Sequence, residues 1–262
     1  MSTDQEKEFK IQRKAEIEKQ GATSKIVAQS NDWLYQSTKF NYSYHFDWMG
    51  RPIIQYPQDI VAMQELIWNV QPDLIVETGI AHGGSLIFNA SMLALLEYSS
   101  CCGEVGVTLD PMKPKRMVLG IDVDIRQHNR VEIESHPMTS RIHMIEGSSI
   151  DPQVVSQVEK FAESYKTILV ILDSNHTHEH VLAELEAYAP LVSLNSYCVV
   201  FDTVIEDFPS NSFPNRPWGK GDNPKTAVWK YLENNSHFEI DSTITSKLLI
   251  SVAPDGYLKR IK

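Results

Sequence analysis

The chain is short of cysteine and of basic residues. Cysteine occurs three times among 262 residues, as Cys101, Cys102 and Cys198, and the adjacent pair is poorly placed to cross-link the fold. A disulfide framework is therefore not expected. The chain is instead expected in a reducing, cytoplasmic environment. Lysine and arginine number 24 against 34 acidic residues, which gives a formal net charge of -10. Such a chain repels a phosphate backbone, which argues against nucleic acid as a partner.

Long apolar runs are missing as well. None approaches the ~20 residues that a membrane-spanning helix needs, so no membrane partner is expected. The N-terminus, MSTDQEKEFKIQRKAEIEKQ, is charged throughout, unlike a signal peptide. Hydrophobic residues at 42% and charged residues at 22% are typical of a globular protein. The length suits one generous domain, or one domain with additions.

What the sequence does contain is a strand, a glycine-rich turn and a helix in succession. The stretch LIVETGIAHGGS (74–85) opens with an apolar run that ends at Glu77, and three glycines follow. Ser85 is predicted to cap the apolar helix LIFNASMLALLEY. Glycine lets a backbone approach a ligand closely, and a helix N-terminus offers free N–H groups. The pattern predicts a ligand-binding crossover.

The glycine spacing narrows the choice of ligand. G-x-G-x-x-G is typical of dinucleotide binding, whereas here three residues separate Gly79 from the pair Gly83 and Gly84. With an acidic residue before the turn, the stretch resembles motif I of the S-adenosylmethionine-dependent methyltransferases. A carboxylate such as Glu77 suits that ligand, which carries an ammonium and a sulfonium charge.

Further apolar runs predict more strands with acidic residues at their ends. ILVIL (168–172) is the most hydrophobic run and is expected at the buried centre of the sheet. Asp122, Asp173 and Asp202 each follow such a run directly. Because ligands bind at the carboxyl ends of parallel strands, these three residues and Glu77 are expected at one edge of the sheet.

Two of these strand ends suggest nucleoside contacts. Asp122 is expected to bind the two ribose hydroxyls, with Asp124 as the nearby competitor. Ser148 and Ser149 follow the third strand and are predicted near an adenine edge. Asp151 is expected to cap the helix that comes next.

The other two strand ends suggest a cation site. Asp173 and Asp202 would repel each other unless a hard divalent cation such as Mg²⁺ lay between them. His176 is a candidate to take a proton from a hydroxyl substrate. Two alternatives stay open: His176 as a structural imidazole at the start of a helix, and a zinc site built from Asp173, His176 and His180.

The N-terminal segments are expected to cover the site or a partner. Residues 3–37 are predicted to be helical, with heavy charge and a thin apolar face that would cover a partner subunit or the active-site mouth. Residues 41–59 are aromatic-rich and broken by glycine and proline. They form either a packed connector or a lid with Arg51, Gln55 and Tyr56 as cofactor contacts.

Three local predictions concern the remaining segments. Asp59 is predicted to cap a helix that runs through Val70. Residues 204–223 hold three prolines in a long irregular loop, which predicts a functional lid. HFEIDS (237–242) and SKLLISVA (246–253) are predicted to be the final, antiparallel pair of strands.

Together these stretches carry a family resemblance. The chain resembles the cephalosporin hydroxylase and rhamnosyl O-methyltransferase family, a branch of the class I methyltransferases, over about residues 50–260. The segments that carry the resemblance are GRPIIQYPQDI, PDLIVETGIAHGGS, VLGIDVDIRQHN, IHMIEGSSID, ILDSNHTHEHV, YCVVFDT, GDNPKTAV and APDGYLKRI.

The resemblance implies an α/β fold. The expected architecture is a Rossmann-like, doubly wound and mainly parallel sheet of seven strands in the order 3-2-1-4-5-7-6, with the last strand antiparallel. An N-terminal helical extension precedes it. Residues 1–57 would form the helical arm and lid segment, and residues 58–262 the methyltransferase domain.

The resemblance also implies site residues. Asp173 and Asp202 would bind Mg²⁺, and Asp173 and His176 would be the catalytic residues, with His176 as general base. The residues expected to bind S-adenosylmethionine are Tyr56, Glu77, Gly79, His82, Gly83, Ser85, Asp122, Ser148 and Ser149.

One departure from the family concerns the metal. The residue before Asp202 is commonly glutamate in the family, and here it is Phe201. The metal would then be weaker, completed by water or by Glu206 or Asp207, or absent.

The implied activity is Mg²⁺-assisted O-methyl transfer from S-adenosylmethionine to a hydroxyl of a small acceptor, a sugar or a similar secondary metabolite. A homo-oligomer is expected. Two rival functions stay open. One is a non-haem iron oxygenase using Asp173, His176 and His178 or His180; the other is a cofactor-binding protein with a degenerate metal site.

Overall fold

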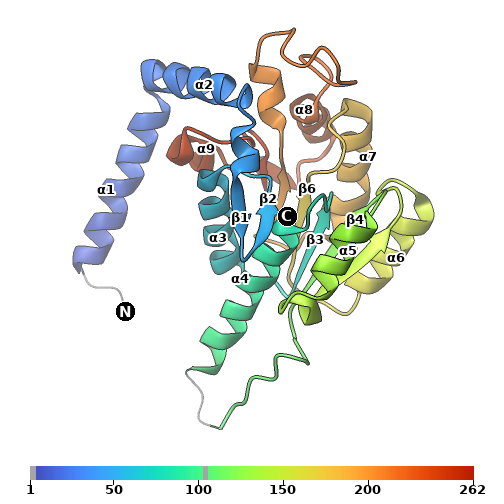
Figure 1. Ribbon diagram of the computed structural model, residues 1–262. Helices are drawn as coiled ribbons and strands as arrows, with labels where there is room; N and C mark the ends of the chain where they lie inside the picture. Colours follow the sequence, from blue (N-terminus) through green and yellow to red (C-terminus); the bar gives the residue numbers. More distant parts are fainter. Residues whose placement is uncertain (1–3, 103–105) are drawn as a thin grey trace.

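The computed structural model describes residues 4–102 and 106–262. A seven-stranded sheet forms the centre, helices cover both of its faces, and two N-terminal helices extend to one side (Figure 1). The strands of the sheet are β3 (Leu74–Thr78), β4 (Met117–Asp122), β5 (Ile142–Glu146), β6 (Ile168–Leu172), β7 (Tyr197–Val200), β8 (Phe238–Ile240) and β9 (Tyr257–Arg260).

The strand order confirms the expected topology. The strands lie in the order β5-β4-β3-β6-β7-β9-β8, which is 3-2-1-4-5-7-6 when these seven are counted along the chain. β3 to β7 pair in parallel, and β9 runs antiparallel to both β7 and β8. β6 lies at the centre and every one of its residues is buried, as its composition predicts. The tips of β3, β6 and β7 therefore lie side by side.

The pleat of the strands divides the apolar side chains between two cores. In β3, Ile75 points to one face while Leu74 and Val76 point to the other. The first face packs against α3 (Pro57–Val70), α4 (Gly84–Cys101) and α5 (Gln127–Glu134). The second packs against α6 (Pro152–Ala162), α7 (His178–Tyr188) and α8 (Pro224–Asn234). The sheet is thus held rigidly from both sides.

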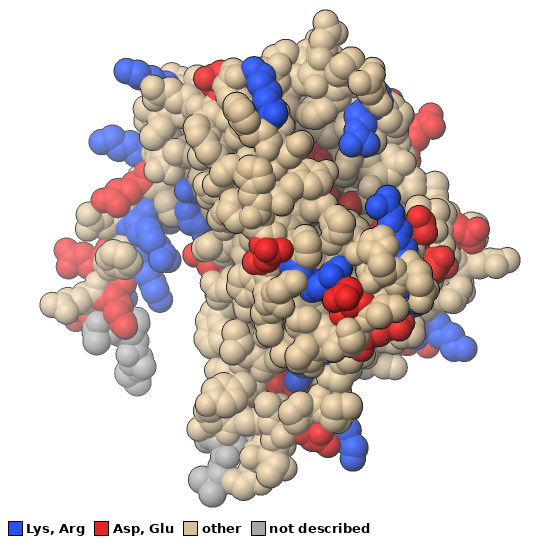
Figure 2. All heavy atoms as spheres, in the orientation of Figure 1, with Lys and Arg blue, Asp and Glu red and all other residues tan. Residues whose placement is uncertain are grey.

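The N-terminal extension consists of α1 (Asp4–Gly21) and α2 (Ser24–Thr38). Residue 3, the first of the predicted helical segment, lies outside the described residues. α1 buries none of its residues, and Figure 2 shows its intermingled basic and acidic side chains on the left. Its end contacts the domain, where Gln20 Nε2 donates to Ser246 O at 2.8 Å. α2 instead buries Leu34 and Ser37 against the domain.

The prediction of a strand at SKLLISVA is wrong. Its first residues belong to α9 (Ser242–Leu248), because Asp241 accepts a hydrogen bond from Thr243 N and so starts a helix there. The seventh strand is β9, further along. Gly256 leads into it at a point where a Cβ would collide with the carbonyl oxygen of Val200. β8, within the predicted HFEIDS segment, does pair antiparallel, but its partner is β9 and not SKLLISVA.

Two predicted helix caps are also wrong. α4 begins at Gly84, after Gly83 at φ 81°, and the Ser85 hydroxyl donates to Glu77 instead of capping. α3 begins at Pro57, and the carboxylate of Asp59 accepts hydrogen bonds from the distant segment that precedes β9. The predicted cap at Asp151 is confirmed by its bond from Gln153 N. In both cases the side chain that the local pattern predicts as a helix cap forms hydrogen bonds with another segment instead.

A small hairpin in the aromatic-rich segment was not predicted. β1 (Phe46–Trp48) pairs antiparallel with β2 (Arg51–Ile53), and each has only three residues. Strands this short carry too few positions for an alternating pattern. Short 3-10 helices occupy Tyr42–His45, Thr139–Arg141, Ala189–Leu191 and Thr203–Asp207.

Two expectations from composition can be compared with the structure. All three cysteines are free thiols. Within the described ranges, the search for a helix that is both long and apolar enough to cross a bilayer finds none.

Candidate functional site

A cavity of about 900 Å³ opens at the carboxyl ends of β3, β6 and β7. Its volume is near the upper end of the ~300–1,000 Å³ usual for ligand pockets, enough for more than one small ligand. α2, the segment after β2 and the loop at residues 204–223 complete its walls. The predicted site residues that line it are Tyr56, Glu77, Gly79, His82, Ser85, Asp173, His176 and Asp202.

The turn after β3 is pressed against the end of β6. Gly79 has φ 90°, which favours glycine, and a Cβ there would collide with the carbonyl oxygen of Asp173. The turn therefore lies in direct contact with the loop that carries Asp173 and His176. Glycine at position 79 thus permits close contact between two segments of the cavity that are almost a hundred residues apart in the chain.

Glu77 is a buried acid on the floor of the cavity. It is 1% exposed, and its carboxylate accepts hydrogen bonds from Ser85 Oγ and from Asn89 Nδ2, the latter at 2.7 Å. Burial raises the pKa of Glu77 to about 7, although both hydrogen bonds favour the ionised form. A cationic group of a ligand would restore its ionisation.

Four predicted cofactor residues do not line this cavity: Gly83, Asp122, Ser148 and Ser149. Asp122 lies behind the turn, where its Oδ2 accepts hydrogen bonds from the backbone N–H groups of Ile80 (2.8 Å) and Ala81 (3.2 Å).

Ser149 faces a different partner. Its Oγ lies 3.0 Å from His180 Nε2, and its residue is 6% exposed. His180 also lies 3.5 Å from Glu184, which has no exposed surface. Ser174, in the loop after β6, contacts both residues: its Oγ lies 3.3 Å from His180 Nε2 and donates to Glu184 Oε1 at 2.6 Å.

The connector at residues 41–59 both packs and lines the cavity. Gln55 and Tyr56 line it, and the Tyr56 hydroxyl lies 2.7 Å from Ser37 Oγ on α2. Arg51 does not reach it. Its guanidinium donates to the carbonyl oxygen of His82 (2.7 Å), which ties the hairpin to the turn after β3.

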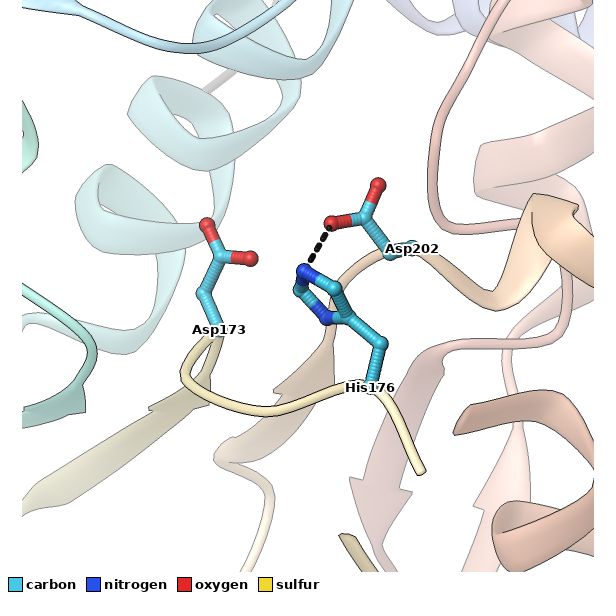
Figure 3. A group of neighbouring side chains, drawn as sticks. All are labelled: Asp173, His176 and Asp202. Atoms are coloured by element: carbon cyan, nitrogen blue, oxygen red, sulfur yellow. Dashed lines mark ion pairs between the residues drawn. The ribbon is translucent and has the colours of Figure 1, made fainter. Parts of the chain in front are cut away.

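Asp173, His176 and Asp202 converge at one side of the cavity (Figure 3). Each offers one potential ligand atom, and these atoms lie within 4.8 Å of one another. The imidazole stands between the two carboxylates, with its Nε2 3.3 Å from Asp202 Oδ2. Among the residues that the structure describes, this is the group of histidine and acidic side chains whose geometry suits a metal ion.

The electrostatics of this group favour a positive charge. Burial raises the pKa of Asp173 well above its ordinary value, and the nearby charges of Asp202 and Glu77 raise it further. A proton or a cation is needed to relieve the repulsion. Carboxylate oxygens are the ligands that hard divalent cations prefer.

The other histidines of the DSNHTHEH stretch point elsewhere. His178 Nδ1 lies 2.8 Å from Thr226 Oγ1, and His180 belongs to the cluster around Ser149. Neither joins the group of Asp173 and His176. The geometry therefore offers neither the zinc site with His180 nor an iron triad with a second histidine.

The two acids proposed as replacement ligands are engaged as well. Glu206 accepts hydrogen bonds from Gly221 N and Asn223 Nδ2, and Asp207 pairs with Lys225 at 2.6 Å. They fasten the loop at 204–223 and do not lie in the ligand group.

Aromatic rings build another wall of the cavity, and sequence reasoning missed them. The ring of Tyr35 on α2 lies 5.4 Å from that of Phe208, which lies 6.1 Å from Phe213. Trp218 meets His176 edge-on at 4.8 Å. Phe201, which directly follows β7, is buried and also lines the cavity. The available signal was the recurrence of aromatic residues in a proline-rich loop already predicted to be functional.

Comparison with known proteins gives relatives over most of the chain. The family model described as Rhamnosyl O-methyltransferase/CmcI matches residues 40–261. A Rhamnosyl O-methyltransferase of Mycobacterium tuberculosis (strain ATCC 25618 / H37Rv) is 28% identical over 240 residues, covering 90% of this chain and 85% of that protein. The Rhamnosyl O-methyltransferase of Mycobacterium leprae (strain TN) is 27% identical over 241 residues, covering 91% and 92%.

Solved structures share the fold. One described as CmcI-N160 apo-structure matches with a TM-score of 0.54 and 18% identity, over 84% of this chain and 77% of that one. Another, described as cmcI-D160 Mg-SAM, matches with a TM-score of 0.53 and 16% identity, over 84% and 78%. At this identity the likeness is evidence for the Rossmann-like fold alone.

Proposed function

The chain belongs to the rhamnosyl O-methyltransferase/CmcI family, and we propose that it methylates a hydroxyl of a sugar or similar natural product with Mg²⁺ assistance. Family membership makes it an S-adenosylmethionine-dependent O-methyltransferase. The observation that carries the finer proposal is the convergence of Asp173, His176 and Asp202 beside the turn at Gly79. This convergence supports the proposal, because Asp173, His176 and Asp202 would activate a hydroxyl beside the turn that would hold the methyl donor.

The floor of the cavity fits the donor. The strand tip offers Glu77, whose carboxylate needs a positive partner, as the donor's ammonium group would be. Gly79, His82 and Ser85 line the same part of the cavity. Asp122 would complete the site behind the turn, and Ser148 and Ser149 would lie toward the adenine. Residues 1–57 would act as arm and lid over the domain of residues 58–262, consistent with α2 forming part of the cavity wall.

The acidic pair fits a divalent metal. The potential ligand oxygens of Asp173 and Asp202 lie within 4.8 Å of each other. The pKa of Asp173 is raised, so a nearby cation would stabilise its ionised carboxylate. Mg²⁺, when bound, would lower the pKa of the acceptor hydroxyl and orient it. Phe201 supplies an apolar wall where the family commonly has a carboxylate, so waters would fill the remaining coordination positions.

His176 is the proposed general base. Its ring is held between the carboxylate of Asp202 and the edge of Trp218. Asp202 stabilises the imidazolium that forms when His176 takes the acceptor proton. The acceptor oxygen then bonds to the donor's methyl carbon as the carbon–sulfur bond breaks. Orientation of the two reactants can supply ~7–11 kcal/mol of the rate enhancement.

The aromatic wall supports an acceptor with extended apolar faces. Tyr35, Phe208 and Phe213 line the same cavity as Asp173, His176 and Asp202. A pyranose ring offers C–H faces to pack on such surfaces and hydroxyls to reach His176. Both Mycobacterium relatives are named for methyl transfer to a rhamnosyl group. An iron oxygenase is disfavoured, because it would need a second histidine where the structure has Asp202.

A calorimetric and product assay tests this function. The protein is titrated with S-adenosylmethionine, with Mg²⁺ and with EDTA, and then incubated with a panel of rhamnosides while S-adenosylhomocysteine is measured. We expect micromolar donor binding and product formation that needs Mg²⁺. Absence of donor binding would contradict the methyltransferase assignment, and full turnover in EDTA would contradict the metal.

A further inference from the structure

A buried carboxylate outside the cavity lies behind the acidic pair. Asp59, in the first turn of α3, has no exposed surface. Its carboxylate accepts hydrogen bonds from Ser251 Oγ (2.6 Å), Val252 N (3.0 Å) and Tyr257 OH (2.8 Å). All three donors are neutral, and burying a carboxylate among neutral donors is costly.

The segment that Asp59 holds runs along the turn that carries Asp202. This segment comprises residues 251–256, and residues 200–204 form the turn. Three hydrogen bonds join the two: Val200 N to Gly256 O (2.8 Å), Thr203 Oγ1 to Pro254 O (2.6 Å) and Val204 N to Val252 O (3.2 Å). The segment at 251–256 therefore fixes the backbone of the turn at 200–204 through these hydrogen bonds.

Asp202 lies between these anchoring bonds. Its backbone has φ 56° and ψ 18°, the left-handed region that a non-glycine residue adopts only when its surroundings impose it. The left-handed conformation places the carboxylate 3.3 Å from His176 Nε2 (Figure 3). A relaxed turn would carry that carboxylate away from Asp173 and His176.

On the premise of the proposed function, we propose that Asp59 is a positioning residue for the metal site. Through the segment at 251–256 it holds Asp202 in the left-handed conformation, with its carboxylate facing Asp173. Asp59 touches neither ligand, and its effect passes through Val252 and Val204. The divalent cation is the ligand whose affinity depends on this arrangement.

Asp59→Asn tests the proposal with little change of shape. The amide keeps one acceptor oxygen but cannot satisfy all three donors. Loss of outer contacts of this kind typically weakens metal binding by ~10–100-fold. We expect about tenfold weaker Mn²⁺ binding by electron paramagnetic resonance, unchanged affinity for S-adenosylmethionine, and recovery of activity at high metal concentration. Amide exchange in residues 200–206 should be faster than in the wild type.

A matched pair of tyrosine variants removes one hydroxyl each. Tyr257→Phe deletes a donor to Asp59. Tyr197 lies on β7, the strand next to β9, and Tyr197→Phe deletes a hydroxyl that donates to Asp241 at 2.9 Å. Both tyrosines are buried. We expect Tyr257→Phe to weaken Mn²⁺ binding about threefold and Tyr197→Phe to leave it unchanged. This pair decides the question if Asp59→Asn fails to fold.

The outcomes separate this proposal from the proposed function. Wild-type Mn²⁺ affinity in folded Asp59→Asn and Tyr257→Phe would overturn the positioning role, whether or not exchange changes. Equal loss in Tyr197→Phe would overturn it too, because the effect would then be a general loss of stability. If the wild type binds no Mn²⁺, the metal site itself fails, and faster exchange at 200–206 alone would still support the hold on Asp202.

Discussion

The two sides of the cavity are built in different ways. On the floor, Glu77 and the turn at Gly79 stand at the tips of strands buried between two layers of helices. On the aromatic wall, Tyr35 from α2 contacts Phe208, which contacts Phe213; both phenylalanines come from a loop more than 170 residues further along the chain. The floor is set by backbone geometry, and the wall by side-chain packing between irregular segments.

This difference teaches which features are exchangeable. A backbone turn held by a glycine has one solution, so the floor suits a ligand shared by a whole family. An aromatic wall on loops can be repacked without disturbing the sheet. We therefore expect changes on the floor to affect donor binding and changes on the wall to affect acceptor binding. A change at His176 should lower turnover and leave donor affinity unchanged.

The largest effect is expected from His176→Ala. Loss of the general base should lower kcat by ~10²–10⁴-fold and leave the affinity for S-adenosylmethionine unchanged. His178→Ala, a histidine of the same stretch that bonds to Thr226, is the matched control. Steady-state kinetics and calorimetry on both variants measure this. An undiminished kcat would remove His176 from the mechanism.

Gly79→Ala should damage the floor. The added Cβ meets a backbone carbonyl, and the positive φ costs an alanine ~1–3 kcal/mol, so donor affinity should fall at least tenfold and Tm should fall. Gly219→Ala is the control, because a Cβ there meets open space. Calorimetry and thermal melts report the two quantities. Equal behaviour of the two variants would mean that the turn does not contribute to the donor site.

Glu77→Gln should remove the pH dependence of donor affinity. In the wild type this affinity should change by up to about tenfold per pH unit below pH 7. The pKa of Glu77 is raised to about 7, so its carboxylate ionises and attracts the donor's ammonium only as pH approaches 7. Wild-type donor affinity should rise with pH up to about 7 and then level off, whereas Glu77→Gln should be weaker and flat. A wild-type profile in the variant would contradict the ammonium contact.

The same residue predicts a change in stability. A raised folded pKa means that the folded state holds its proton longer than the unfolded state does. The contribution of Glu77 is therefore fully present below pH ~4.5 and is lost as pH rises to about 7. Glu77→Gln should show a smaller decrease in the free energy of unfolding over this window in urea melts. An unchanged decrease would mean that other groups cause it.

The smallest effect is expected on the wall. Phe213→Ala removes a ring contact with Phe208, worth ~1 kcal/mol, so KM for the acceptor should rise about fivefold with donor affinity unchanged. Phe40→Ala, at a side chain 73% exposed, is the control. A loss of donor affinity in Phe213→Ala would contradict the hypothesis that the floor binds the donor and the aromatic wall binds the acceptor.

The sequence predicts the floor of the cavity better than its surroundings. Hydrophobic runs locate the strands, and the acids that follow them reach one edge because parallel strands end together. Two of the predictions that failed involve side chains with distant partners. Ser85 and Asp59 fit the pattern of helix caps, yet each bonds across the fold, to Glu77 and to the segment before β9.

By itself, the sequence determined the glycine turn and the identity of the acids at the strand tips, because these depend on local periodicity and on the rules of parallel sheets. The strand order was expected only from the family resemblance that its motifs carry. Only the tertiary structure decided which histidine joins Asp173 and Asp202, and which rings face it. Those choices depend on how α2, the loop at 204–223 and the segment before β9 pack together. Packing between segments so far apart leaves no periodic signal in the chain.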